Sequence, residues 1–146
     1  MMTMTGSILI DMSSFETDLN GWTTGGMDQP FVRLSGSTRS WSTGPQGATD
    51  GSYYVYAETS GQYGKKFDLQ KTVPVGQELY GVAFQYHMYG STMGSAILET
   101  SADGTNWVSL WSKSGDQGNQ WLLATVYAGS GQTMLRYTCV SNGRGV

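Results

Sequence analysis

Few side chains in this sequence could carry out acid–base, nucleophilic or metal chemistry. His87 is its single histidine and Cys139 its single cysteine, and its eleven Asp and Glu residues are scattered along the chain. A zinc site needs several Cys or His ligands, and catalysis by paired carboxylates needs two acids placed across a cleft. We therefore predict no catalytic residues and no enzyme activity, and we expect His87 to be a hydrogen-bonded structural residue.

Cys139 lies in the segment 134–140, whose β-branched and aromatic residues predict a strand. One cysteine cannot form an intrachain disulfide, and a nucleophilic thiol would need a basic neighbour. We therefore predict that Cys139 is buried as a small hydrophobic residue.

Residues suited to recognition lie in polar segments. Trp41 interrupts the segment 35–44, which otherwise contains only Ser, Thr, Gly and Arg. It either closes the end of the core or stacks on a ligand, and the first is the preferred interpretation. The segment 112–120 holds Asp116, Gln117 and Asn119, whose side chains could bind sugar hydroxyls or a neighbouring subunit. These four residues are the candidate ligand-binding or partner-binding residues.

Composition excludes several classes of function. The chain has 146 residues and a formal charge of −3, and it has no basic cluster larger than Lys65-Lys66. A nucleic-acid interface needs several aligned cations, so we expect no nucleic-acid partner. No apolar run approaches the roughly 18 residues of a membrane span. The length fits one domain.

The elements that must position these residues are strands. Strands are predicted for residues 53–58, 79–89, 96–100, 107–112, 121–127 and 133–140. In the segment 79–89, Phe84 and Tyr86 would share the core face, and His87 would lie on the other face. Asp103-Gly104, between two predicted strands, indicates a hairpin turn. No segment has a sustained helical period, so the sequence predicts an all-β sandwich or barrel.

Several motifs, in order along the chain, resemble the MAM domain family. The early segment 15–22 reads Phe-Glu-Thr-Asp-Leu-Asn-Gly-Trp, and the segment 84–94 reads Phe-Gln-Tyr-His-Met-Tyr-Gly-Ser-Thr-Met-Gly. The resemblance implies a two-sheet antiparallel, jelly-roll-like β-sandwich with roles in adhesion and assembly. It places the sandwich at residues 14–146, with residues 1–13 as an N-terminal arm or first strand.

The chain departs from the family pattern in its cysteines and at its end. Where the family has paired cysteines, this sequence has Ser13, Asn20 and Gly81, which suggests a disulfide-free variant suited to folding in reducing cytosol. The family's closing strand is also missing after residue 142. The chain could be a fragment, the segment 7–10 could replace that strand, or a neighbouring subunit could supply it.

The resemblance also suggests a metal site. Some MAM domains hold a cation near the early acidic motif, which here corresponds to Glu16 and Asp18, with Asp50 as a further oxygen donor. Calcium prefers six to eight oxygen ligands. A Ca²⁺ or Na⁺ ion at Glu16, Asp18 and Asp50 is one interpretation, and a solvated acidic strand end is the other. No further cofactor is expected.

Two functions remain open. The first is a non-catalytic structural module on the surface of a virion or other large complex, such as a capsid decoration or a tail or fibre component. It would be assembled in the cytosol and act through protein–protein contacts in a homo-oligomer or larger assembly. The alternative is an adhesion or recognition module that binds a glycan or protein on a host cell surface. In either case we expect the chain to work on the outside of a virion or cell.

Overall fold

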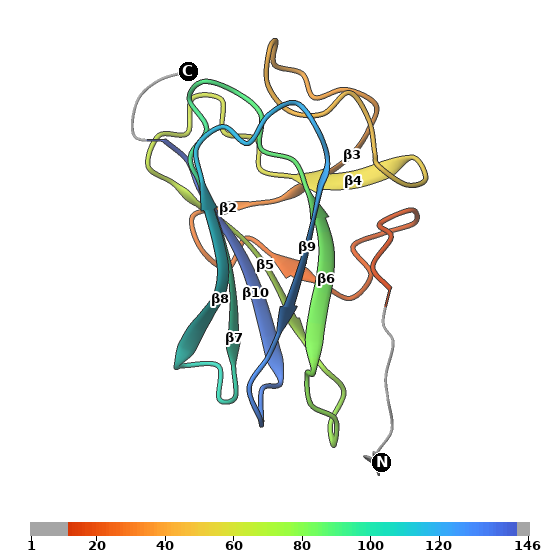
Figure 1. Ribbon diagram of the computed structural model, residues 1–146, viewed down its shortest axis with the longest axis vertical. Helices are drawn as coiled ribbons and strands as arrows, with labels where there is room; N and C mark the ends of the chain where they lie inside the picture. The colour runs from red at the N-terminus through yellow and green to blue at the C-terminus, as the bar shows by residue number, and fades with distance from the viewer. Residues whose placement is uncertain (1–11, 143–146) are drawn as a thin grey trace.

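The computed structural model describes residues 12–142, and over this range the chain consists of strands, turns and loops without a helix (Figure 1). The strands are β1 (Thr23–Thr24), β2 (Gln29–Pro30), β3 (Val32–Ser35), β4 (Tyr53–Tyr56), β5 (Lys66–Thr72), β6 (Gly81–Tyr86), β7 (Ser95–Ser101), β8 (Trp107–Ser114), β9 (Leu122–Tyr127) and β10 (Met134–Val140). The predicted all-β class is confirmed. Residues 1–11, including the segment 7–10, lie outside the described range.

The strands form two layers, one of which is an unbroken sheet and the other is divided. One layer is an unbroken sheet with the order β1-β5-β10-β7-β8, to which β2 adds by pairing with β5. The opposing layer is divided into the pairs β3–β4 and β6–β9, which share no backbone ladder with each other. Every pairing is antiparallel except that of β2 with β5. The expected antiparallel sandwich is therefore present.

The core between the layers contains two clusters of buried side chains. One gathers Tyr86, Met88, Ala96 and Ala124, and the other Phe31, Phe67 and Leu69. Tyr137 and Cys139, both on β10, pack against both clusters and so join them. Complete burial of its thiol raises the pKa of Cys139 to about 12. The prediction that Cys139 is a buried hydrophobic residue is confirmed.

Strand β6 shows the predicted alternation but is shorter than expected. Tyr86 and Phe84 face the core, whereas Ala83 and Gln85 are exposed. The predicted strand 79–89 ends at Tyr86 because loops from elsewhere take the next carbonyl groups. The oxygen of Met88 accepts a bond from Gln117 N at 2.7 Å, and that of Tyr89 accepts one from Gly44 N at 3.1 Å. The other predicted strands correspond to β4, β7, β8, β9 and β10.

The central strand β5 was not predicted from sequence. Its segment Lys-Phe-Asp-Leu-Gln-Lys-Thr places charged residues within a strand that pairs with β1, β2 and β10. Asp68 is buried, at 3% exposed, and its Oδ1 accepts a bond from Met27 N at 2.8 Å. Buried carboxylates are tolerated when they are hydrogen-bonded in this way. The partner lies 41 residues away, so no local pattern could reveal it.

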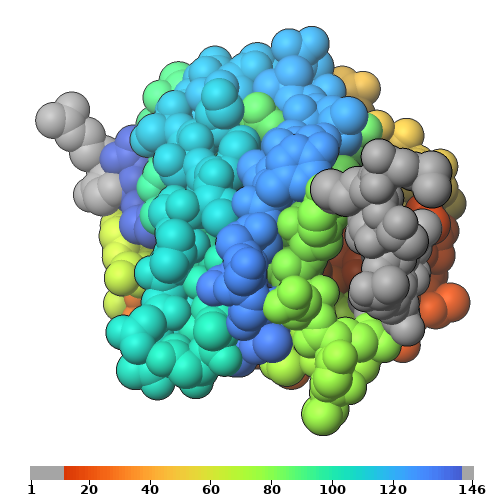
Figure 2. Space-filling model, turned by 60° about the horizontal axis from the view of Figure 1, so that its bottom comes forward, coloured from red at the N-terminus to blue at the C-terminus, as the bar shows by residue number. Residues whose placement is uncertain are grey.

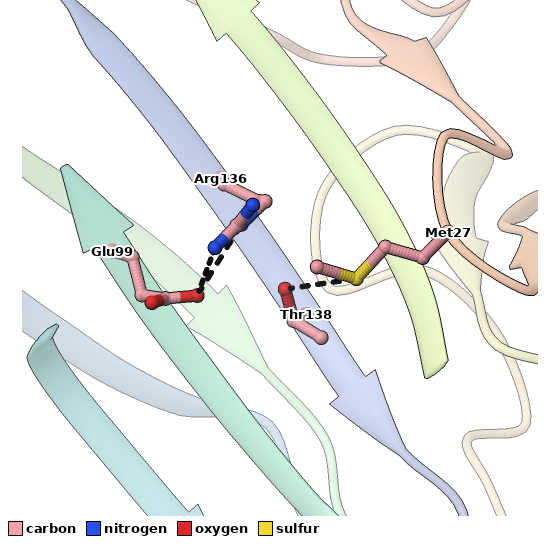
Figure 3. A network of polar contacts seen from close by, with 4 residues as sticks. All are labelled: Met27, Glu99, Arg136 and Thr138. Atoms are coloured by element: carbon pink, nitrogen blue, oxygen red, sulfur yellow. Dashed lines mark hydrogen bonds and ion pairs between the residues drawn. The ribbon is translucent and has the colours of Figure 1, made fainter. Parts of the chain in front are cut away.

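Polar pairs cross the outer face of the continuous sheet (Figure 3). Arg136 on β10 lies opposite Glu99 on β7, and its Nη2 is 3.2 Å from Glu99 Oε1. The same guanidinium lies 4.0 Å above the ring of Trp107 on β8. Such cross-strand pairs hold strand register, and together they tie three neighbouring strands of this sheet.

The two ends of the sandwich carry different connections. At one end the connections join β5 to β6, β7 to β8 and β9 to β10, and Figure 2 brings this end forward. The β7–β8 turn is held by Asp103, whose Oδ1 accepts bonds from Thr105 N and Asn106 N at 2.8 Å each. The predicted hairpin is confirmed. The opposite end carries the connections that join β3 to β4, β6 to β7 and β8 to β9.

Candidate functional site

Three connections joined by hydrogen bonds lie at one end of the sandwich. They are the loop 36–52 between β3 and β4, the loop 87–94 between β6 and β7, and the loop 115–121 between β8 and β9. We call this region the loop end. All four residues predicted to bind a ligand or partner lie on two of these loops.

Hydrogen bonds fasten these loops to one another. The carbonyl of Tyr89 accepts bonds from Thr43 Oγ1 at 2.7 Å and Gly44 N at 3.1 Å. The indole Nε1 of Trp121 donates to the carbonyl of Gly47 at 3.0 Å. Because each loop is tied to another, the loop end presents a fixed surface, and a fixed surface loses less entropy on binding a partner.

Asp116 and Gln117 serve mainly to shape the loop end. Asp116 Oδ1 accepts bonds from Gly118 N at 2.9 Å and Gly90 N at 3.4 Å. Gln117 donates through its backbone to Met88 and through its side-chain amide to the carbonyl of Ser114. Because these bonds use much of the hydrogen-bonding capacity of Asp116 and Gln117, the two residues are less suited to contact a ligand than the sequence suggested.

Asn119 lies beside His87 in a small pocket. The pocket has a volume of about 310 Å³ and is lined by the segment 45–48, His87 and the segment 119–121. The Nε2 of His87 lies 3.2 Å from Asn119 Oδ1, which confirms that His87 is hydrogen-bonded. Its other ring nitrogen, Nδ1, is buried and has no protein partner. An unsatisfied buried nitrogen of this kind is uncommon in folded proteins.

Burial lowers the pKa of His87, and the hydrogen bond with Asn119 partly opposes that effect. The imidazole is therefore neutral at pH 7, with one nitrogen a donor and the other an acceptor. The pocket accordingly offers an uncharged polar group beside the aromatic Trp121, whose ring centroid lies 5.4 Å from that of His87. Polar groups beside aromatic surface are typical of ligand pockets.

Trp41 does not close the core, so that interpretation was wrong. Its side chain is 96% exposed. Thr38 bonds across to Thr43 and Pro45, which closes the segment 39–42 into a projecting tip. Trp121 covers the core end instead, because it is anchored to Gly47 and packs edge-on against Tyr54 at 5.9 Å.

Two of the three candidate metal ligands accept hydrogen bonds from different turns. Glu16 Oε1 accepts bonds from Ser52 N and Tyr53 N at 2.8 Å each. Asp18 Oδ1 accepts from Asn20 N at 2.7 Å in a different turn, and Asp50 is exposed. Within residues 12–142 no three His, Cys, Asp or Glu side chains come together as metal ligands. A cation at these residues remains a prediction.

The bonds to Glu16 have an electrostatic consequence. The pKa of Glu16 is lowered chiefly by the N–H groups of Tyr53 and Ser52, with a smaller contribution from Arg33. Its carboxylate therefore stays ionised and holds the start of β4. These bonds give Glu16 a structural role, whether or not a cation also binds there.

Comparison with known proteins identifies the domain family of this chain. A family model described as MAM domain, meprin/A5/mu, matches residues 13–143, so this chain belongs to the MAM domain family. The resemblance seen in the sequence is thus confirmed. The match is to a domain family of adhesion-type modules and not to a catalytic family.

Individual relatives agree with this assignment. The MAM domain-containing glycosylphosphatidylinositol anchor protein 1 of Rattus norvegicus is 36% identical over 97 residues, which cover 60% of this chain and 10% of that protein. The thyroid hormone-induced protein B of Xenopus laevis is 33% identical over 100 residues, covering 63% and 14%. The chain therefore corresponds to only a small part of these relatives.

A solved structure supports the fold. The K2 cleaved adhesin domain of Lys-gingipain aligns with a TM-score of 0.62 at 18% identity, covering 83% of this chain and 81% of that domain. At this identity the likeness establishes the sandwich fold alone. Among residues 12–142 there is also no helix long and apolar enough to cross a membrane.

Proposed function

We propose that this chain is a non-catalytic recognition module whose loop end binds a partner on a cell surface. The observation that carries this proposal is Trp41, which is 96% exposed at the tip of a loop fastened to its neighbours. Exposed tryptophans are costly to solvate and are enriched among residues that dominate binding energy. A surface location for the module is part of the proposal.

The chemistry of the loop end favours a glycan or a polar protein surface. Trp41 offers a flat apolar face, while Asn119 and His87 offer amide and imidazole groups at a pocket lined in part by the same loop. An aromatic plane and uncharged hydrogen-bonding groups on one end of the sandwich suit a ligand that is itself part apolar and part hydroxylated.

The alternative of an assembly component on a virion has less support. The matched proteins are named for a MAM domain, a glycosylphosphatidylinositol anchor and an adhesin, and none of these names refers to a virion. Protein–protein contact is common to both functions. Size-exclusion chromatography with light scattering separates them, because an assembly component should form a stable oligomer without any ligand.

Binding of the Trp41→Ala variant to a glycan array and to cultured cells tests the proposal. We expect at least a tenfold loss of binding relative to the unmodified chain, as for a central hot spot. Stability should change by less than about 0.5 kcal/mol, because the side chain packs against little.

Val75→Ala is the matched control, since Val75 is equally exposed but lies in the connection between β5 and β6. It should bind as the unmodified chain does. Unchanged binding by Trp41→Ala would rule out the loop tip as the contact, and failure of the unmodified chain to bind would reject the function.

A further inference from the structure

The loop end carries both a projecting aromatic side chain and a small pocket. Trp41 is 96% exposed, so its indole lies outside the pocket of its own chain. The pocket has a volume of about 310 Å³ and is lined in part by the segment 45–48 of the same loop. Figure 1 shows this loop, between β3 and β4, projecting from that end of the sandwich. The volume is at the lower limit of the roughly 300–1,000 Å³ of ligand pockets, so the pocket suits a single ring system.

Short contacts fix the tip relative to the pocket. Thr38 N donates to the carbonyl of Pro45 at 3.2 Å, and Thr38 Oγ1 donates to that of Thr43 at 2.9 Å, which joins the two sides of the tip at its base. Gly44 has a φ of +68°, and a Cβ there would clash with Thr38 Oγ1. Since Pro45 also lines the pocket, the position of Trp41 relative to the pocket is set within one loop.

The pocket offers the groups that a buried indole needs. Its lining includes the rings of His87 and Trp121, whose centroids lie 5.4 Å apart, and aromatic rings pair favourably with one another. The exposed side-chain amides of Gln46 and Gln120 also line it. An indole N–H usually finds an acceptor when it is buried, and an amide oxygen is one.

We infer that the loop ends of two copies of this chain bind each other, with Trp41 of each copy inserted into the pocket of the other. A twofold arrangement makes both contacts at once, because each copy presents the same patch. The inference rests on the proposed recognition by Trp41 and names one partner for it, a second copy of this chain.

Charge at the loop end fits two copies. Arg39, two residues before Trp41, and Asp50, two residues after the segment 45–48, are both exposed. Neither side chain forms a hydrogen bond or ion pair within residues 12–142, although the charge of Arg39 also acts on Glu58 of its own chain. Insertion of the tip would bring Arg39 of one copy toward Asp50 of the other, and the twofold arrangement would repeat this opposite-charge pair.

The area of such a contact indicates its strength. An inserted aromatic side chain buries about 150–250 Å², and a stable interface needs roughly 800 Å² per partner. Two loop tips and their rims fall short of that area. We therefore expect a reversible dimer that depends on concentration, and not the stable oligomer of an assembly component.

Sedimentation velocity of the full chain at increasing concentration tests the inference with two variants that remove opposite halves of the contact. Trp41→Ala removes the inserted side chain. Gly47→Leu fills the pocket, and the fold should tolerate it because a Cβ at Gly47 would meet no atom within 4 Å. Each variant alone should dimerise at least about tenfold more weakly than the unmodified chain.

An equimolar mixture of the two variants is the decisive sample. It should dimerise more strongly than either variant alone, because Trp41 of the Gly47→Leu chain fits the open pocket of the Trp41→Ala chain. Gly129→Leu is the matched control, since Gly129 lies between β9 and β10 at the opposite end and also has open space around its Cβ position. It should dimerise as the unmodified chain does.

Two results would overturn the inference. One is an unmodified chain that stays monomeric at every concentration reached, and the other is a mixture that associates no more strongly than its separate variants. Binding to cells and glycan arrays is measured separately. A monomeric chain that binds cells through Trp41 would overturn the self-contact alone, whereas a chain that dimerises through Trp41 but binds no cell or glycan would reject the cell-surface partner alone.

Discussion

The continuous sheet and the divided layer opposite it differ in how completely their strands are paired. In the continuous sheet, β10 is paired along its full length with β5 on one side and β7 on the other. In the divided layer, no strand is paired on both edges within residues 12–142. The comparison teaches that the two layers differ in how much backbone pairing holds them, so we expect the continuous sheet to be the more stable of the two.

The buried residues follow the same division. Phe67 and Leu98 of the continuous sheet are each 2% exposed, whereas Phe84 on β6 is only partly buried. Phe67 and Phe84 are thus the same residue type in the two layers. Replacing each by alanine compares the layers directly.

The largest effect is expected for Phe67→Ala. Phe67 packs with Phe31 and Leu69, and its removal should leave a cavity that the paired strands around it cannot close. We expect a loss of about 3–5 kcal/mol in the free energy of unfolding, measured by urea denaturation. A loss below about 1 kcal/mol would contradict the view that this sheet is the rigid half.

A smaller effect is expected for Phe84→Ala. Its ring meets Trp111 edge-on at 4.9 Å and Tyr137 at 5.7 Å, but it is only partly buried. We expect a loss of about 1–3 kcal/mol in the same denaturation experiment. If this variant loses as much free energy of unfolding as Phe67→Ala, the divided layer is as tightly packed as the continuous sheet. The comparison between the layers then fails.

The smallest effect is expected from the protonation of His87, which makes the stability of the fold depend on pH. Because burial lowers the pKa of folded His87, the unfolded chain takes up the proton first as the pH falls below about 6.5. Stability should therefore decline between pH 7 and pH 5, with a decrease in Tm on the order of 1–2 °C because the ring is partly exposed to solvent.

His87→Gln should remove that decline, and Asn119→Ala should enlarge it by removing the bond that favours the protonated ring. Glu16 and Glu58 have pKa values lowered below 4.5 and titrate at more acidic pH. A decline of equal size in the His87→Gln variant would assign the effect to other groups.

Sequence alone predicted the features whose causes are local. The Asp103 turn could be predicted because its carboxylate binds amides two and three residues away. The faces of β6 could be predicted because alternation along one strand is visible in the sequence. Family motifs extended the prediction to the sandwich as a whole.

Features whose causes are distant in sequence could not be predicted. Trp41 lies in a polar segment and Trp121 at the start of the predicted strand 121–127, and local sequence does not show which of the two closes the end of the core. The answer depends on the carbonyl of Gly47, which lies 74 residues from Trp121. Likewise, β5 is stabilised at Asp68 by a partner on a loop 41 residues away. The bonds from Ser52 N and Tyr53 N to Glu16 Oε1 span 36 and 37 residues and were likewise not visible in the sequence.

The buried thiol of Cys139 has a practical consequence. Because burial raises the pKa of Cys139 to about 12, its thiol stays protonated at pH 7, and the thiolate is the form that reacts with alkylating reagents. A cysteine introduced on the surface, for example at Val75, would therefore be the one site at which a dye or a bead attaches to the folded chain. The molecule is thus suited to single-site labelling without prior removal of its own cysteine.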